Sequence, residues 1–252
     1  METNDLTRSR RPAGNTATTW LKIIALVFMF IDHAGKMLFP GVAEMRILGR
    51  IAFPVYVWCM IVGFHYTRSV PKYLLRILVV GLLSQPLYML ALNHTWKQPN
   101  VFLTLFLGLC ALWGIREKKF LSHLWAPAAT LILAIVLGAD YGWKGVLLFI
   151  LLYAVRDSRP GIAAVMVSFF LFWGTSFSVT KSLFGLSIDL NDLPVWISQL
   201  LSPFLRLETY ALLGLPLILV RFRKDLKLPR WLGYALYPAH LALLYALELI
   251  MK

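Results

Sequence analysis

The sequence predicts an all-α protein, a polytopic bundle of about nine to ten transmembrane helices. The first observation is composition: 59% of the 252 residues are apolar and 15% are charged, whereas about 25% of an ordinary soluble domain is charged. The second is a series of apolar runs near the roughly 20 residues that a helix needs to cross a bilayer. We expect spans at 20–39, 48–67, 73–92, 100–115, 124–139, 143–155, 160–178, 203–220 and 231–251.

These spans use most of the chain and predict two parts. Residues 1–19 form a polar N-terminal tail, and residues 20–252 form a single transmembrane domain, because the short loops leave no room for a soluble domain. The stretch 179–202 is ambiguous, since Leu193 to Leu201 could add a tenth, tilted or interfacial helix. The first apolar run leads into Asp32 and His33 rather than into a small-residue cleavage site, so we expect no cleavable signal peptide.

The distribution of basic residues predicts the orientation in the membrane. The net charge is +13, and 16 of the 25 Lys and Arg residues fall in the segments that share a side with the N-terminus, against 8 on the other side. Under the positive-inside rule, the N-terminus and its tail are cytoplasmic. The basic residues are scattered over separate loops, which argues against nucleic-acid binding. The two cysteines, Cys59 and Cys110, both lie in expected spans and predict no disulfide framework.

Ionisable residues inside spans are the strongest functional candidates, because they are costly in a bilayer. Asp32 and His33 lie in the outer half of the first span, and neighbours on a helix point about 100° apart, so each needs its own partner. Asp32 could instead simply pair with Lys36, four residues on, leaving His33 a packed neutral imidazole. Arg50, at the outer edge of the second span, faces the bundle or extends to the interface.

Other polar residues fall in the middle or outer half of their spans under this orientation. Gln85, Asn100 and Thr104 either bind substrate or serve as hydrogen bonds between helices. Asp140 and Tyr237 are further candidates for binding substrate. The shared depth of a larger set predicts a polar cavity that opens outward; this set is Asp32, His33, Arg50, Gln85, Asn100, Asp140 and His240. Ser202, Arg206 and Glu208 either join this site or belong to a loop.

The remaining histidines, His65, His94 and His123, show no metal-ligand spacing, so we expect no metal site. No phosphate-binding or serine-hydrolase motif occurs in the chain.

Several short motifs, taken in order, resemble the TraX family from about Lys22 to the C-terminus. They are Lys22-Ile23-Ile24-Ala25 with Met29-x2-Asp32-His33, Gly49-Arg50-Ile51-Ala52-Phe53-Pro54, Tyr73-Leu74-Leu75-Arg76 with Ser84-Gln85-Pro86, Asn100-Val101-x2-Thr104-Leu105-x2-Gly108, Asp140-Tyr141-Gly142-x2-Gly145, and Tyr237-Pro238-x-His240. The tail 1–19 and the segment 179–209 carry no part of this resemblance.

The resemblance implies an integral membrane acetyltransferase of the inner or plasma membrane, related to the larger group of multi-span membrane acyltransferases. Acetyl-CoA would be the donor, and the acceptor would be the N-terminal amine of pilin, or another extracytoplasmic protein or small molecule with an amine or hydroxyl. Proteins of that group use a membrane-embedded histidine and arginine near the start of the chain, which implies His33 as catalytic residue and Arg50 as its partner.

Acyl transfer needs a base for the acceptor's proton and donors for the developing oxyanion. We expect His33 to be the base, or briefly to carry the acetyl group, with Asp32 orienting neighbouring donors. Arg50 or Asn100 would stabilise the oxyanion, and His240 would be a second base or proton relay. The competing interpretations are a small-molecule transporter or exporter with a central polar cavity and a scaffold subunit without chemistry.

Overall fold

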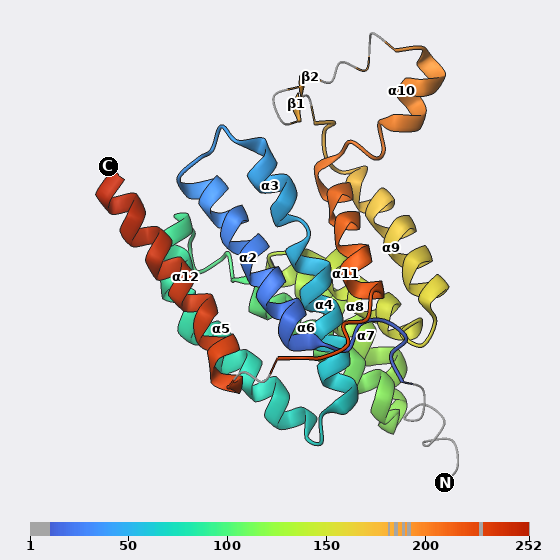
Figure 1. Ribbon diagram of the computed structural model, residues 1–252. Coiled ribbons are helices and arrows are strands. Elements are labelled where there is room, and N and C mark those ends of the chain that lie inside the picture. The colour runs from blue at the N-terminus through green and yellow to red at the C-terminus, as the bar shows by residue number, and fades with distance from the viewer. Residues whose placement is uncertain are drawn as a thin grey trace.

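The computed structural model describes residues 11–180, 182–183, 186–187, 190, 193–226 and 229–251, and these residues are almost entirely helical. Figure 1 shows the elements as a bundle. In chain order they are α2 (Thr18–Met37), α3 (Ala43–Gly49), α4 (Ala52–Tyr66), α5 (Val70–Leu92), α6 (Val101–Glu117), the 3-10 helix η1 (Lys119–Leu121), α7 (Ser122–Val136), α8 (Gly142–Ala154), α9 (Arg159–Gly174), β1 (Ser182–Leu183), β2 (Leu186–Ser187), α10 (Val195–Leu201), the 3-10 helix η3 (Leu207–Gly214), α11 (Leu215–Leu219) and α12 (Arg230–Met251). The predicted all-α class is confirmed. The exception among these elements is one pair of antiparallel strands, β1 and β2, with two residues each.

Helix α4 forms the centre of the bundle. Eleven of its fifteen residues are buried, and a helix that is apolar on every side is expected in an interior. It packs against α2, α6, α8 and η3. The surrounding helices therefore pack around one central, buried helix.

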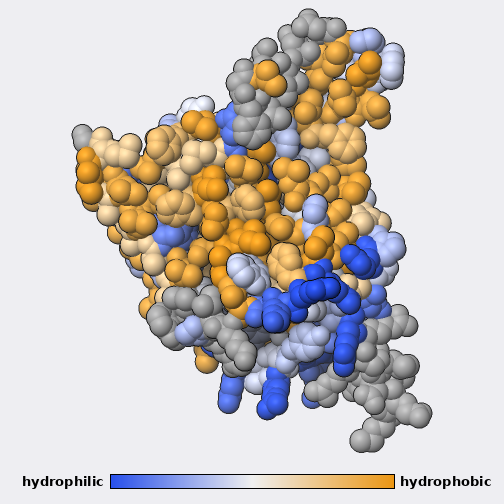
Figure 2. Space-filling view, in the orientation of Figure 1, coloured by the Kyte–Doolittle hydropathy of each residue, from blue (hydrophilic) through white to orange (hydrophobic). Residues whose placement is uncertain are grey.

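The outer helices carry apolar side chains on their exposed faces. Leu82 and Leu83 of α5, Val136 of α7 and Ile250 of α12 are all exposed. In Figure 2, apolar residues cover much of the visible face of the molecule, and strongly hydrophilic residues gather at its lower end. Exposed apolar flanks of this extent indicate a membrane protein, because water would disfavour them.

The expected count of nine to ten spans is not confirmed. Within the described part of the chain, five helices are long and apolar enough to cross a membrane: Thr18–Met37, Ala43–Tyr66, Val70–Leu92, Lys119–Val136 and Gly233–Met251. Three shorter apolar helices follow at Gly142–Ala154, Arg159–Gly174 and Leu207–Leu219. The expected span 203–220 is a 3-10 turn followed by five α-helical residues, and the possible tenth helix is the seven-residue α10, which projects from the bundle.

The described part of the expected polar tail, from residue 11 to the start of α2, contacts the bundle. Residues 1–10 lie outside the described residues, but Asn15 is fully buried. Its backbone oxygen accepts a hydrogen bond of 2.7 Å from the Trp58 indole, and its backbone N–H donates to Ile218. The segment before α2 is thus packed into the bundle, because these polar groups find partners on α4 and α11.

The bundle has two distinct ends. The basic end is where α2 begins, α4 ends and α5 begins; the histidine end is where α2 ends and α3 lies, at the top of Figure 1.

Candidate active site

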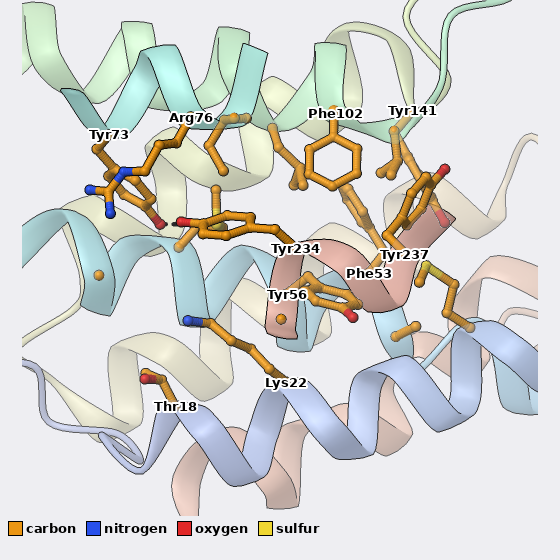
Figure 3. A pocket seen from close by; sticks show the side chains of 18 of the residues that line it. Thr18, Lys22, Phe53, Tyr56, Tyr73, Arg76, Phe102, Tyr141, Tyr234 and Tyr237 are labelled. Atoms are coloured by element: carbon orange, nitrogen blue, oxygen red, sulfur yellow. Dashed lines mark hydrogen bonds between the residues drawn. The ribbon is translucent and has the colours of Figure 1, made fainter. Parts of the chain in front are cut away.

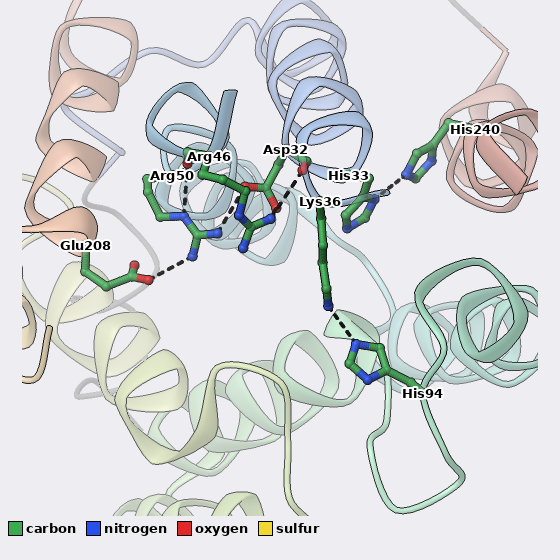
Figure 4. Close-up of polar contacts among 8 residues, drawn as sticks. All are labelled: Asp32, His33, Lys36, Arg46, Arg50, His94, Glu208 and His240. Atoms are coloured by element: carbon green, nitrogen blue, oxygen red, sulfur yellow. Dashed lines mark hydrogen bonds and ion pairs between the residues drawn. The ribbon is translucent and has the colours of Figure 1, made fainter. Parts of the chain in front are cut away.

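Asp32, near the end of α2, is held by two arginines. Its carboxylate accepts hydrogen bonds from Arg46 Nη1 at 2.6 Å and from Arg50 Nη2 at 3.0 Å. Arg50 also donates from Nη1 to Glu208 at 2.8 Å and from Nε to the Arg46 carbonyl at 3.3 Å. These contacts tie α2, α3 and η3 together in one ion-paired cluster (Figure 4).

The local sequence explains how this cluster forms. Arg46 and Arg50 are four residues apart, so they project from the same side of the α3 segment. Gly49, between them, lies directly against Asp32, and a Cβ at this position would overlap the Asp32 side chain. The glycine therefore permits the close approach of α2 and α3 that the ion pairs require.

His33, the next residue on α2, faces a different partner. Its Nδ1 lies 2.8 Å from Nε2 of His240 on α12, and the two rings are stacked nearly parallel at a centroid distance of 5.1 Å. The Nδ1 of His240 lies 3.2 Å from the Leu236 carbonyl, which can only accept a hydrogen bond.

These contacts assign the proton positions when both rings are neutral. His240 Nδ1 carries a hydrogen and donates to Leu236, so His240 Nε2 is an acceptor. His33 Nδ1 then carries the hydrogen shared by the two rings, and the lone pair of His33 lies on Nε2. The arrangement leaves one basic nitrogen of His33 outside the pair.

Lys36, near the end of α2, contacts another histidine, His94. Lys36 Nζ is 2.9 Å from Nε2 of His94, in the loop between α5 and α6. Burial, followed by the Lys36 ammonium, lowers the pKa of His94. The neutral His94 ring therefore accepts from Lys36, and the alternative pairing of Lys36 with Asp32 does not occur.

A cavity of about 820 Å³ connects the two ends of the bundle. At the histidine end its wall contains Asp32, His33, Asp140 and Tyr141. At the basic end the wall contains Lys22, Arg68, Lys72 and Arg76. Figure 3 shows the side chains of Lys22 and Arg76 entering the cavity from opposite walls.

Tyrosines supply much of the polar surface between these ends. Seven of the chain's ten tyrosines line the cavity: Tyr56, Tyr66, Tyr73, Tyr88, Tyr141, Tyr234 and Tyr237. A phenolic hydroxyl can donate and accept hydrogen bonds without carrying charge. The interior is thus polar enough for a polar ligand.

Asp140 lies in the turn between α7 and α8 and borders the cavity. Its accessible surface is high because it faces this space, while protein atoms crowd it on the other sides. Burial raises its pKa to about 6, and the nearby Arg50 guanidinium opposes that shift. Access to cavity water favours a smaller shift than burial alone would give.

The structure brings together part of the residue set predicted from sequence. Four of the predicted residues line the cavity: Asp32, His33, Asp140 and Tyr237. His240 does not line the cavity but contacts His33, which does. Arg50 binds Asp32.

The other three predicted substrate-binding residues make structural hydrogen bonds and do not line the cavity. Asn100 caps α6 by accepting from Phe102 N, and its amide donates to the Gly81 carbonyl. The Gln85 oxygen accepts from the Asn100 backbone N–H. The Thr104 hydroxyl accepts from the Tyr141 backbone N–H at 3.3 Å.

Sequence reasoning missed Arg46 and left Glu208 undecided. The spacing of four from Arg50 was the available signal for Arg46. Glu208 joins the cluster across 158 residues of chain. By contrast, Arg206 donates to backbone carbonyls near the end of α9, and the Ser202 hydroxyl donates to Gln199, so both serve the loop.

Comparison with known proteins identifies the family. The family model described as TraX protein matches residues 17–248, nearly the whole chain. The chain belongs to the TraX family. This confirms the resemblance found in the sequence.

Two relatives are similar in sequence to this TraX-family chain. An uncharacterised protein of Rickettsia prowazekii is 29% identical over 147 residues, which cover 56% of this chain and 57% of that protein. A protein of Dichelobacter nodosus named as a probable fimbrial assembly protein is 27% identical over 249 residues, which cover 92% of this chain and 96% of that protein. No solved structure matches the chain.

Proposed function

We propose that this protein is an integral membrane acetyltransferase. It moves an acetyl group from cytosolic acetyl-CoA to an amine or hydroxyl on the other side of the inner or plasma membrane. The observation that carries the proposal is the cavity that joins a basic end to the His33–His240 pair. The N-terminus and the basic end lie on the cytoplasmic side in this proposal, in keeping with the positive-inside rule.

His33 acts as general base. Its Nε2 takes the proton of the acceptor amine as the amine nitrogen attacks the thioester carbonyl carbon. The carbon–sulfur bond then breaks, and the proton passes to the departing thiolate, so the products are an amide and a free thiol. A hydroxyl acceptor gives an ester by the same steps.

His240 holds His33 in the reactive tautomer. It accepts the Nδ1 hydrogen of His33 and is fixed by the Leu236 carbonyl. This is the task of the third member of a catalytic triad, which orients the imidazole and stabilises its charged form. Tyrosine hydroxyls of the cavity wall, Tyr141 among them, are the candidate oxyanion donors. Arg50 contributes through Asp32, because three of its five N–H groups are already bound.

The acceptor class follows from the family and one relative. The Dichelobacter nodosus relative is named for fimbrial assembly, and a pilin-type protein presented at the histidine end is the proposed acceptor. A cavity through the bundle would also suit a transporter, in which a histidine pair can act as a proton relay. The TraX family and the relative named for fimbrial assembly favour the acetyltransferase.

The test uses purified protein in detergent with labelled acetyl-CoA and an amine acceptor. Wild-type protein is expected to transfer the label. His33→Ala is expected to lose a factor of about 10²–10⁴, the usual contribution of a general base. Donor-independent solute uptake into proteoliposomes, with equal rates for wild type and His33→Ala in the transfer assay, would contradict the proposal in favour of transport.

A further inference from the structure

Basic and acidic side chains lie at opposite ends of the cavity wall. Lys22, Arg68, Lys72 and Arg76 line this end, whereas the two carboxylates in the cavity wall, Asp32 and Asp140, lie at the histidine end. None of the four basic side chains forms an ion pair with a carboxylate among the described residues. Asp225 is also at this end, where its carboxylate accepts hydrogen bonds from the backbone N–H groups of Thr19 and Trp20, but it does not line the cavity. An anion that entered here would meet positive charge from several segments and no carboxylate of the cavity wall.

Orientation in the membrane alone does not account for this arrangement. Other basic residues gather at the same end of the bundle, because Arg116, at the end of α6, donates to the carbonyl of Phe64 near the end of α4. Yet Lys118 and Lys119, which follow it, do not line the cavity. Arg68, Lys72 and Arg76 are exposed and line the cavity. The positive-inside rule places basic residues on a side of the membrane, but it does not determine which of them surround the entrance to a cavity.

The four cations come from opposing walls. Lys72 and Arg76 are one turn apart on α5, so they project on the same side, and Arg76 Nε donates to the Lys72 carbonyl at 3.1 Å. Lys22 extends from α2 toward them across the cavity (Figure 3). A group with several negative oxygens would therefore be contacted from two sides.

The separation between this cluster and His33 restricts the ligand. Lys22 and His33 lie on the same helix, eleven residues apart, which is about 16 Å at 1.5 Å per residue. A small donor such as acetyl phosphate, which carries phosphate and acyl group on adjacent atoms, cannot occupy both places. The ligand must carry its phosphates at one end and its reactive acyl group at the end of a long, narrow arm.

We infer that Lys22, Arg68, Lys72 and Arg76 form a phosphate-binding site for the nucleotide end of an acyl-CoA-type carrier. This inference rests on the proposed function and adds to it where the carrier is held and by which residues. The nucleotide phosphates stay at the basic end, and the thioester arm runs along the tyrosine-lined cavity to His33. An anionic lipid headgroup shares the phosphate chemistry, but the cluster lines the route to His33 and not the apolar flank.

The first experiment measures binding of adenosine 3′,5′-bisphosphate to full-length protein in nanodiscs of zwitterionic lipid. Lys72→Ala/Arg76→Ala is expected to weaken binding at least tenfold, whereas the charge-matched control Lys118→Ala/Lys119→Ala binds as wild type. The charge-preserving variant Lys72→Arg/Arg76→Lys is expected to retain binding. Equal weakening in the test and control variants would overturn the site, as would unchanged binding in the test variant.

The second experiment separates this inference from the proposed function. With acetyl-CoA, Lys72→Ala/Arg76→Ala is expected to raise KM at least tenfold; with acetyl-pantetheine, which has no nucleotide, it is expected to match wild type. His33→Ala is expected to bind the bisphosphate normally without transfer. If wild type transfers nothing, the binding result alone decides the site. Competition by phosphatidylglycerol nanodiscs that abolishes bisphosphate binding would assign the site to lipid and overturn the inference.

Discussion

Asp32 and His33 are adjacent on α2, but they differ in the charge and number of their partners. The Asp32 carboxylate is paired with two arginines, and one of these is paired again with Glu208. His33 is paired with one neutral partner and keeps a basic nitrogen beside the cavity. Two costly polar groups on one helix thus have different surroundings: Asp32 is bound in an ion-paired cluster, whereas in the proposed function His33 is the residue that reacts.

The largest effect on stability should come from breaking the ion-paired cluster. Asp32→Asn leaves Arg46 and Arg50 without their carboxylate in a largely buried place, and loss of one partner of a buried pair costs about 3 kcal/mol of unfolding free energy. Thermal unfolding in detergent measures this loss. Glu117→Gln is the control, because Glu117 lies 4.0 Å from Arg116 at a more exposed position and such pairs contribute under about 1 kcal/mol. Equal effects of the two changes would contradict a structural role for Asp32.

His240 provides the next test, on rate instead of stability. His240→Ala removes the acceptor for the Nδ1 hydrogen of His33, and kcat is expected to fall about 100-fold. His240→Gln retains an acceptor oxygen and is expected to recover part of the rate. The KM for acetyl-CoA should stay the same in both variants. If His240→Ala changed only the unfolding temperature and left kcat and its pH profile unchanged, His240 would be a packing residue.

Gly49 tests whether the close approach of α2 and α3 is needed. Gly49→Ala places a methyl group against Asp32, and overpacking of this kind costs about 1–3 kcal/mol. Gly41→Ala is a matched control from the loop before α3, because a Cβ there meets no atom within 4 Å. Comparison of the two unfolding midpoints checks this; similar midpoints would mean that the helices separate without cost.

The smallest effect concerns Asp140 and pH. Its folded-state pKa is raised from 3.8 to about 6 by burial, so between these values the folded state binds more protons than the unfolded state. Stability therefore falls as pH rises through this range and levels off above about 6. Asp140→Asn should remove that dependence, which unfolding midpoints measured across the range would show. Parallel curves for wild type and variant would mean that cavity water cancels the shift.

The sequence singled out more of the residues at the histidine end of the cavity than of the residues that hold them. Asp32, His33, Arg50 and His240 stood out because ionisable groups in apolar runs are expensive. Arg46 and Glu208 could not be assigned, because their roles depend on α3 folding back along α2 and on a contact with η3 across 158 residues. Asn100 caps α6 and does not line the cavity, and its position just before an apolar run is typical of a helix N-cap.

The number of spans was the weakest prediction. Apolar runs report hydrophobicity but not where a helix breaks, and the run at 203–220 divides into η3 and α11. Helix α8, with 13 residues, extends only about 20 Å, less than the roughly 30 Å of a hydrocarbon core. Such short segments depend on packing against neighbours, which a hydropathy pattern does not contain.

The most direct test of the account uses sealed membrane vesicles of both orientations and externally added acetyl-labelled acetyl-CoA, which does not cross a bilayer. The account predicts that inverted vesicles, with the basic end outward, accumulate labelled product in their interior, identified by mass spectrometry, and that His33→Ala vesicles do not. Right-side-out vesicles should stay unlabelled. Equal labelling of right-side-out vesicles, or labelling of His33→Ala vesicles at the wild-type rate, would contradict transfer from the basic end to His33.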